Sequence, residues 1–206
     1  MTFRAVRSAI LIAAISVIPA SAFAQTRPWF VGGLGGVTFG TVASGALGAQ
    51  FGTQIRPNLF VIGEVGRMRN VMPREINDMF ESLRDEFEFP VTLEVSAPAT
   101  YAFGGLRFVQ PRRPVAPFVE GGAGFGRVGI QIDRAEVLGE DFKSELEDEL
   151  GSDRSETAFL LAIGGGVHAR LRDALGIDVG YRYTLIAVDD PAVKVSMIYV
   201  AVKFGR

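Results

Sequence analysis

His168 is the single histidine of the chain, and the sequence contains no cysteine. A histidine could act as a general base toward a nearby serine, as acyl-group hydrolases require. The candidate serines fall in segments that connect the predicted strands: Ser44, Ser144, Ser152 and Ser155. Because His168 precedes a short turn at Arg172, we expect it at the opposite end of the molecule from them, and we expect no catalytic residue. Because the sequence has one histidine and no cysteine, we also expect no metal site and no cofactor site.

Two further chemical patterns are set aside on physical grounds. The segment 124–129 has the glycine spacing of a dinucleotide-binding loop, which needs a helix that begins at the glycines. Here a strand pattern continues through Ile130, so we expect these glycines in a crowded strand. An aspartic-protease site needs two carboxylates that share one position. Glu64, Glu120 and Asp178 each have other polar neighbours instead, so an enzyme is the least favoured interpretation.

Charged residues recur on the polar side of the predicted strands. Counting outward from the short turns gives these neighbours: Gln50 with Glu64, Arg107 with Glu120, and His168 with Asp178 and Arg182. Buried charges are costly unless they are paired. We therefore expect an internal ion-pair and hydrogen-bond network that fills and rigidifies the interior. A conducting pathway is the alternative, although eight strands leave an interior just wide enough for side chains.

Eight runs of alternating apolar and polar residues must position these side chains. The runs are 29–39, 46–55, 59–68, 100–109, 117–130, 158–171, 175–185 and 195–204. Their usual length of about ten residues is what a tilted strand needs to cross a bilayer. Connections at 56–58, 110–114 and 172–174 are short, those at 70–98, 131–156 and 186–194 are longer, and 40–44 is a short exception. The sequence predicts an all-β fold, an eight-stranded antiparallel up-and-down transmembrane barrel.

The alternation assigns two faces but does not reveal which one points inward. In 175–185 one side carries Ile177, Val179 and Tyr181, and the other carries Asp178 and Arg182. A soluble lipocalin-like barrel would turn the apolar side inward, whereas a membrane barrel turns it toward lipid. We favour lipid, because glycines on the polar side would leave space in a narrow lumen for long charged side chains.

The first 24 residues are typical of a signal peptide. Arg4 and Arg7 precede an apolar run at 9–18, and Ala22-Phe23-Ala24 supplies a cleavage site. The run is shorter than the roughly 20 residues of a spanning helix, although an N-terminal anchor is the alternative. We expect a signal peptide at 1–24 and a barrel domain at 25–206. The part after residue 24 has 19 basic and 23 acidic residues, which argues against a nucleic-acid binder.

Two long connections carry helical patterns with many acidic residues. One is 73–87, where Ile76, Phe80, Leu83 and Phe87 recur at helical spacing, and the other is roughly 136–150. We predict two short helices there, in extracellular loops. A solvated face is the plainest interpretation of the acidic residues, and a cation site or a partner surface is the alternative.

Several phrases of the sequence are shared with a known family: RPNLFV at 56–61, VAPFVEGGAG at 115–124, GGGV at 164–167 and LGIDVGYRY at 175–183. The chain resembles the small eight-stranded outer-membrane β-barrel proteins of the OmpA/OmpX-like superfamily over essentially all of 29–204. The resemblance implies insertion by the outer-membrane assembly machinery, which recognises a last strand that ends in an aromatic residue. Ile198, Val200, Val202 and Phe204 alternate in this way before Gly205 and Arg206. We expect no peptidoglycan-binding domain of the longer members.

These observations predict a non-enzymatic integral protein of the cell outer membrane, with a lumen largely filled by side chains. Its expected role is envelope integrity or surface interaction through the acidic loops. The alternative is a narrow channel for small or apolar solutes, with 32–36 as the place for a lateral exit. The expected partners are outer-membrane lipid and lipopolysaccharide, the assembly machinery and a surface ligand of the loops. We expect a monomer that binds no nucleic acid.

Overall fold

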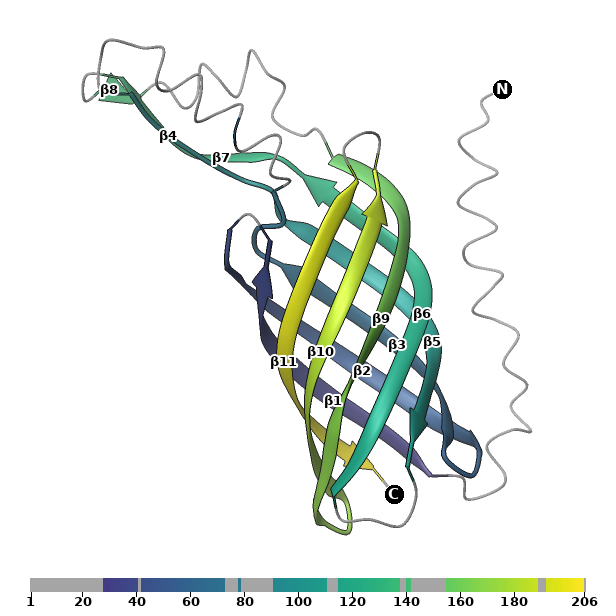
Figure 1. The fold of residues 1–206 in the computed structure, drawn as a ribbon. Coiled ribbons are helices and arrows are strands. Elements are labelled where there is room, and N and C mark those ends of the chain that lie inside the picture. Colours follow the sequence, from purple (N-terminus) through teal and green to yellow (C-terminus); the bar gives the residue numbers. More distant parts are fainter. Residues whose placement is uncertain are drawn as a thin grey trace, which may run out of the picture.

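Eight strands of the computed structural model form one closed antiparallel barrel, in the order β1-β11-β10-β9-β6-β5-β3-β2 (Figure 1). The strands are β1 Trp29–Phe39, β2 Ser44–Arg56, β3 Leu59–Met68, β5 Ala99–Val109, β6 Val115–Gly129, β9 Ser155–Arg172, β10 Leu175–Ala187 and β11 Val193–Gly205. The structure describes residues 28–40, 42–72, 78, 91–110, 115–137, 140–141, 155–188 and 192–205. The predicted barrel is confirmed, with strand bounds that differ from the predicted ones by a few residues.

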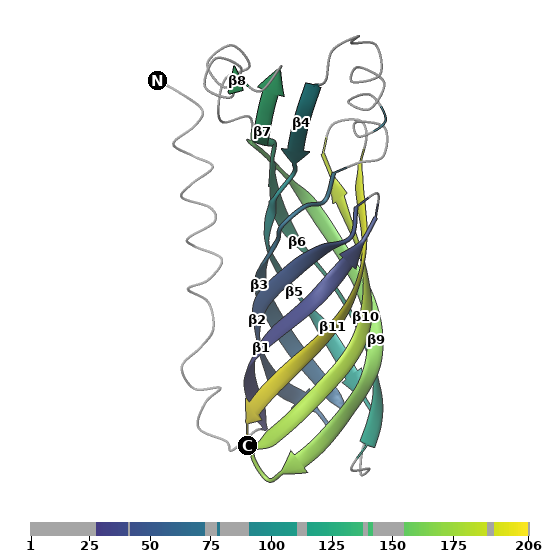
Figure 2. The same cartoon turned by 90° about the vertical axis from the view of Figure 1, so that its left-hand side faces the viewer.

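The two ends of the barrel differ in the length of their connections (Figures 1 and 2). The tight turns after β2 and β9 lie at the end where β11 finishes, which we call the turn end. Asn58 adopts a φ of 77° in the first of these turns, a left-handed conformation that asparagine tolerates better than most residues. The Gly205 amide donates to the Ala174 carbonyl over 3.0 Å, which ties the last strand to the β9–β10 turn. The opposite end is called the loop end.

A second, three-stranded sheet extends beyond the barrel rim at the loop end (Figures 1 and 2). It consists of β4 Val91–Ser96, β7 Gln131–Val137 and β8 Glu140–Asp141, in the order β4-β7-β8. Since β4 leads into β5 and β7 follows β6, the β4–β7 pair continues the β5–β6 ribbon outward. These segments were predicted as parts of long loops, and that prediction is wrong.

The predicted helix at 136–150 is also wrong at its beginning. Glu136 pairs with Asp141 between β7 and β8, and it also pairs with Thr92 of β4. The β-branched residues of the VTLEVS segment provide a partner strand, and pairing then overrides a helical spacing of leucines. Residues 142–150 lie outside the described part. In the predicted helix at 73–87 only Asp78 is described, with helical backbone, so that helix stays a prediction.

The outer surface of the barrel is apolar, and its interior holds the charges. Leu47, Ile163 and Phe51 are 72%, 67% and 61% exposed, whereas Asp178 and Arg182 are 0% and 1% exposed. Soluble monomers rarely expose contiguous apolar patches beyond a few hundred Å², and here every barrel strand exposes apolar side chains on its outer face. The predicted assignment of faces is confirmed, and a lipocalin-like barrel with an apolar interior is wrong.

Aromatic side chains gather on the outer face near both ends of the barrel. Trp29, Phe108 and Phe204 are exposed toward the turn end. Toward the loop end Phe125 and Phe159 are exposed and meet edge to face, with ring centroids 6.4 Å apart. Two aromatic girdles that flank an apolar band are the pattern by which membrane barrels anchor at the two interfaces.

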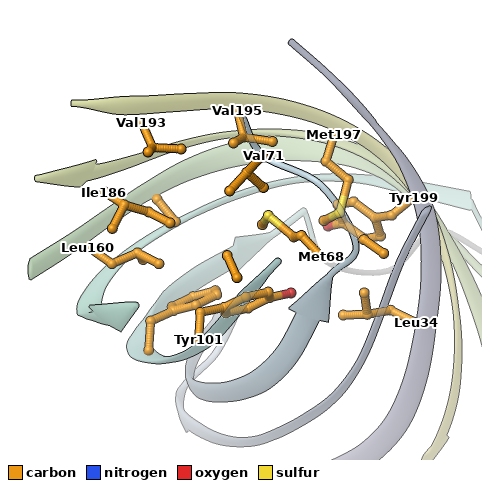
Figure 3. Packing of buried hydrophobic residues seen from close by; sticks show 14 of the residues in the cluster. Leu34, Met68, Val71, Tyr101, Leu160, Ile186, Val193, Val195, Met197 and Tyr199 are labelled. Atoms are coloured by element: carbon orange, nitrogen blue, oxygen red, sulfur yellow. The ribbon is translucent and has the colours of Figure 1, made fainter. Parts of the chain in front are cut away.

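The interior near the loop end is closed by apolar side chains, which we call the apolar plug (Figure 3). Its members include Leu34, Met68, Val71, Leu160, Ile186, Val193, Val195 and Met197. Val71 belongs to the segment after β3 and is inserted into the lumen, where its amide donates to the Ala97 carbonyl over 2.8 Å. The Asn70 carboxamide oxygen accepts from the amides of Met72 and Ala97, each at 3.1 Å, and thereby fixes this segment.

The barrel wall is continuous at 32–36, where the alternative of a narrow channel would place a lateral exit. The segment 32–36 of β1 pairs residue by residue with β2 on one side and with β11 on the other. Both ladders extend beyond it in each direction, from Phe30 to Thr38. Glycines at 32–36 therefore do not open a gap between strands. The described residues also contain no helix that is long and apolar enough to cross a membrane.

Candidate functional site: the charged lumen

Arg182 is the central side chain of the lumen. It extends from β10 across the barrel and makes a two-pronged ion pair with Glu64 of β3, in which Nη2 donates to Oε2 over 2.8 Å. The same Nη2 donates to Glu120 Oε1 of β6 over 2.6 Å. A planar guanidinium suits this role, because its fixed fork of donors can hold two carboxylates at once. One arginine thus links three strands that are distant from one another in sequence.

Neutral side chains add hydrogen bonds to the two glutamates. Tyr101 donates its hydroxyl proton to Glu64 Oε1 over 2.8 Å, and Gln50 donates to Oε2 over 3.0 Å. Tyr199 donates to Glu120 Oε1 over 2.9 Å. A buried carboxylate that is both ion-paired and hydrogen-bonded loses much less on leaving water than a bare one. The cluster is therefore compatible with the interior of a narrow barrel.

A second cluster lies nearer the turn end and is centred on Asp178 of β10. Its Oδ2 is 2.7 Å from Arg107 Nη1 and 2.6 Å from Lys203 Nζ, while Oδ1 is 2.7 Å from His168 Nδ1. Arg107 Nη1 is also 3.6 Å from Glu120 Oε2, which connects the two clusters. The lumen network is thus one continuous set of side chains.

Aromatic rings also contact the three buried cations of the network. The Arg107 guanidinium carbon lies 3.6 Å from the centroid of the Phe118 ring, and Lys203 Nζ lies 4.0 Å from that of Phe30. Arg182 is similarly placed between Phe103 and Tyr199, at 4.9 and 5.0 Å. Attraction between a cation and a ring face strengthens when water is excluded. Through Phe30 even β1, which carries no buried charge, contributes to the network.

Small residues make room for the long side chains, as the sequence predicts. A methyl group at Gly180 would lie 2.7 Å from Tyr199 Cζ, and one at Gly66 would lie 2.5 Å from the Tyr101 hydroxyl. These are the two tyrosines that bind the glutamates. The glycines are therefore part of the network, because their missing side chains define where the phenol rings can lie.

We expect that the substitution Gly180→Ala lowers the free energy of unfolding by about 1–3 kcal/mol. The new methyl group displaces the Tyr199 ring, so that Glu120 loses a buried hydrogen bond. Denaturant titration of the barrel in lipid vesicles measures the change. The matched control is Gly104→Ala on the outer face, where the nearest heavy atom would be 3.8 Å away. An equal loss in both variants would contradict this role of Gly180.

The sequence-predicted neighbours lie where they were expected. Gln50 pairs with Glu64, Arg107 with Glu120 and His168 with Asp178 in the strand register. Sequence reasoning missed Tyr101, Tyr199 and Lys203, together with the reach of Arg182 across the barrel. The signal for the residues of β11 was present, because Tyr199 and Lys203 lie on the side of the strand opposite to its exposed Ile198, Val200, Val202 and Phe204.

His168 lies near the turn end, and its ring binds Asp178. The described candidate serines have other partners: Ser44 binds Thr38 and Asn70, and Ser155 binds Arg127. Ser144 and Ser152 lie outside the described residues. The segment 124–129 is part of β6, so its glycines do belong to a strand, and a methyl group at Gly124 would lie 2.0 Å from the Ala102 carbonyl. The described residues hold no group of three acidic, histidine or cysteine side chains that could bind a metal.

Comparison with known proteins gives a family match and several similar folds. The family model described as "Outer membrane protein beta-barrel domain" matches residues 9–204. The fold is similar to the Neisserial surface protein A, with 13% identity, a TM-score of 0.58, and coverage of 87% of this chain and 97% of that one. It is also similar to the N-terminal β-barrel domain of Pseudomonas aeruginosa OprF, with 12% identity, a TM-score of 0.52, and coverage of 87% and 97%. No curated protein matches in sequence.

Proposed function

Because the chain belongs to the outer membrane protein beta-barrel domain family, we propose that it is a non-conducting structural barrel that supports the integrity of the outer membrane. The observation that carries this proposal is the double closure of the lumen. A solute that enters from the turn end meets the ion-paired side chains of Asp178, Arg107 and Arg182 first. Beyond them it meets the apolar plug, whose Leu160, Ile186 and Met197 are 0% exposed.

Both closures oppose conduction for physical reasons. Breaking a buried ion pair leaves an uncompensated charge and costs about 3–5 kcal/mol, so the closure formed by the ion-paired side chains is open in only a small fraction of the molecules. The apolar plug offers no hydrogen-bond partner that could replace the water shell of an ion. A filled lumen also makes the barrel stiff, which suits a protein whose contribution to the envelope is mechanical.

We expect that purified protein in planar lipid bilayers shows no stable unitary conductance in potassium chloride. The reason is that the two closures lie in series, so that opening one leaves the other shut. A wide porin inserted under the same conditions is the positive control. A band on a detergent gel whose mobility changes only after the sample is boiled verifies that the sample contains intact barrels. Reproducible single-channel steps of the folded protein would overturn the structural role and favour the alternative of a narrow channel.

The same proposal includes a location, partners and the absence of catalysis. We place the barrel in the outer membrane with the tight turns toward the periplasm, as is usual for such barrels. The proposed partners are lipopolysaccharide at the outer face and the assembly machinery during insertion. Surface interaction through the acidic segments stays a prediction from the sequence. An unchanged lipid A profile in a deletion strain supports a non-enzymatic role, whereas a changed acyl pattern would contradict it.

A further inference from the structure

A cavity of about 330 Å³ opens at the turn end of the lumen, below the Asp178 cluster. Its walls include apolar surface from Phe30, Phe60, Val109 and Leu175. This size lies at the lower end of the range for small-molecule sites, which combine apolar walls with a few polar groups. Arg107 and Lys203 are the most buried charged residues of its lining, so we take their side chains as the bottom of the cavity.

The charged groups around this cavity are mostly positive. Four basic side chains line it: Arg107, Arg170, Arg172 and Lys203. Asp173 is the one carboxylate among the lining residues described. His168, also in the lining, has its Nδ1 bound to Asp178. The electrostatic potential in the cavity therefore favours an anion.

The two cations at the bottom of the cavity share one carboxylate oxygen. Arg107 Nη1 and Lys203 Nζ both approach Asp178 Oδ2, at 2.7 and 2.6 Å. Both nitrogen atoms are buried, and neither makes a hydrogen bond of normal geometry with the described residues. An ammonium group has three donor protons and a guanidinium has five. Donor capacity is thus left over at the point where the cavity ends.

We propose that this cavity is a binding site for a small organic anion, held by its carboxylate or phosphate group. The anionic group binds Lys203 and Arg107 at the bottom, and the apolar part lies against Phe30 and Phe60. Arg170 and Arg172 lie nearer the turn, where they attract the anion from the periplasmic side. Binding here does not require conduction, because the ligand enters and leaves by the same opening.

Benzoate and inorganic phosphate are suitable probes, and benzyl alcohol is the neutral analogue of benzoate. The single histidine reports on the site, because the His168 ring lines the cavity and gives one set of ring signals in a proton NMR spectrum. We expect saturable shifts of these signals with benzoate or phosphate and none with benzyl alcohol at the same concentration. Calorimetry in a non-ionic detergent at constant ionic strength gives the affinity.

The variant Arg170→Gln/Arg172→Gln tests the charges without disturbing the buried network, since both side chains are exposed. We expect its affinity for benzoate to fall by about tenfold or more, the loss of a charge-assisted contact. The matched control is Arg56→Gln, an exposed arginine at the same end that does not line the cavity, and its affinity should change by less than about twofold.

Three results would overturn the site: no shift of the His168 signals with either anion, equal binding of benzyl alcohol, or an equal loss of affinity in the control variant. The last result would mean that the anion responds to the general charge of the turn end. The outcome is separable from the structural role of the barrel. A conducting protein could still bind the anion, and a non-conducting one could fail to bind it.

Discussion

Replacing Arg182 with methionine is expected to lower the free energy of unfolding by about 3–5 kcal/mol. Arg182 is 1% exposed and bound to both Glu64 and Glu120, so its removal leaves two carboxylates in the lumen with much of their charge unpaired. Methionine fills similar volume, and the loss therefore reports on charge and not on a cavity. Denaturant titration in lipid vesicles measures the change.

Two further variants identify the source of this loss. Arg67→Met, at an exposed position of β3, should change the stability by no more than about 1 kcal/mol. Adding Glu64→Gln and Glu120→Gln to Arg182→Met removes the unpaired charges and should restore part of the stability. An Arg182→Met protein as stable as the Arg67→Met control would show that the network does not stabilise the barrel.

The substitution Val179→Arg is expected to lower the free energy of unfolding by about 2–4 kcal/mol, the value for a charge on the lipid face near the bilayer midplane. Val179 lies on the outer face near the middle of β10, between Val167 and Val200 of the neighbouring strands, and is 52% exposed. In an aqueous environment the same substitution at an exposed position would be nearly neutral. The variant therefore separates a membrane barrel from a soluble one.

A depth control accompanies this variant. Thr53 also lies on the outer face, but near the turn end, between Trp29 and Val61. An arginine side chain at that height can reach the membrane–water interface, so Thr53→Arg should lower the free energy of unfolding by only about 0–1 kcal/mol. Folding titrations of both variants in the same vesicles give the comparison. Equal costs at the two depths would mean that the outer surface does not follow the polarity gradient of a bilayer.

The barrel and its two faces could be predicted from the sequence because the strand period of two is strict. The alternation from Ile177 to Tyr183 repeats without interruption, and a one-residue slip would place Asp178 and Arg182 in lipid. The strand register across short turns could be predicted equally well, because a tight turn such as that at Asn58 allows few ways to pair the two strands. The pairing of Gln50 with Glu64 follows directly from the position of this turn.

Contacts across the lumen could not be predicted in this way. The reach of Arg182 to Glu64 and Glu120 depends on the curvature of the closed sheet, which no local pattern encodes. The extension formed by β4 and β7 was missed for a related reason. Each strand becomes stable only through its partner, and the partner is distant in sequence, whereas the helical spacing of leucines after Glu136 is a local signal.

The central claim is that the outer face contacts lipid over the whole circumference, and spin labelling tests it most directly. The chain has no cysteine, so single cysteines at Phe51, Val119 and Val179 can carry nitroxide labels, with one at Asp173 as the aqueous control. In proteoliposomes we predict that the three outer labels collide often with oxygen and rarely with a water-soluble nickel chelate, and that the turn label shows the reverse. Outer labels that collide mainly with the nickel chelate would contradict the claim.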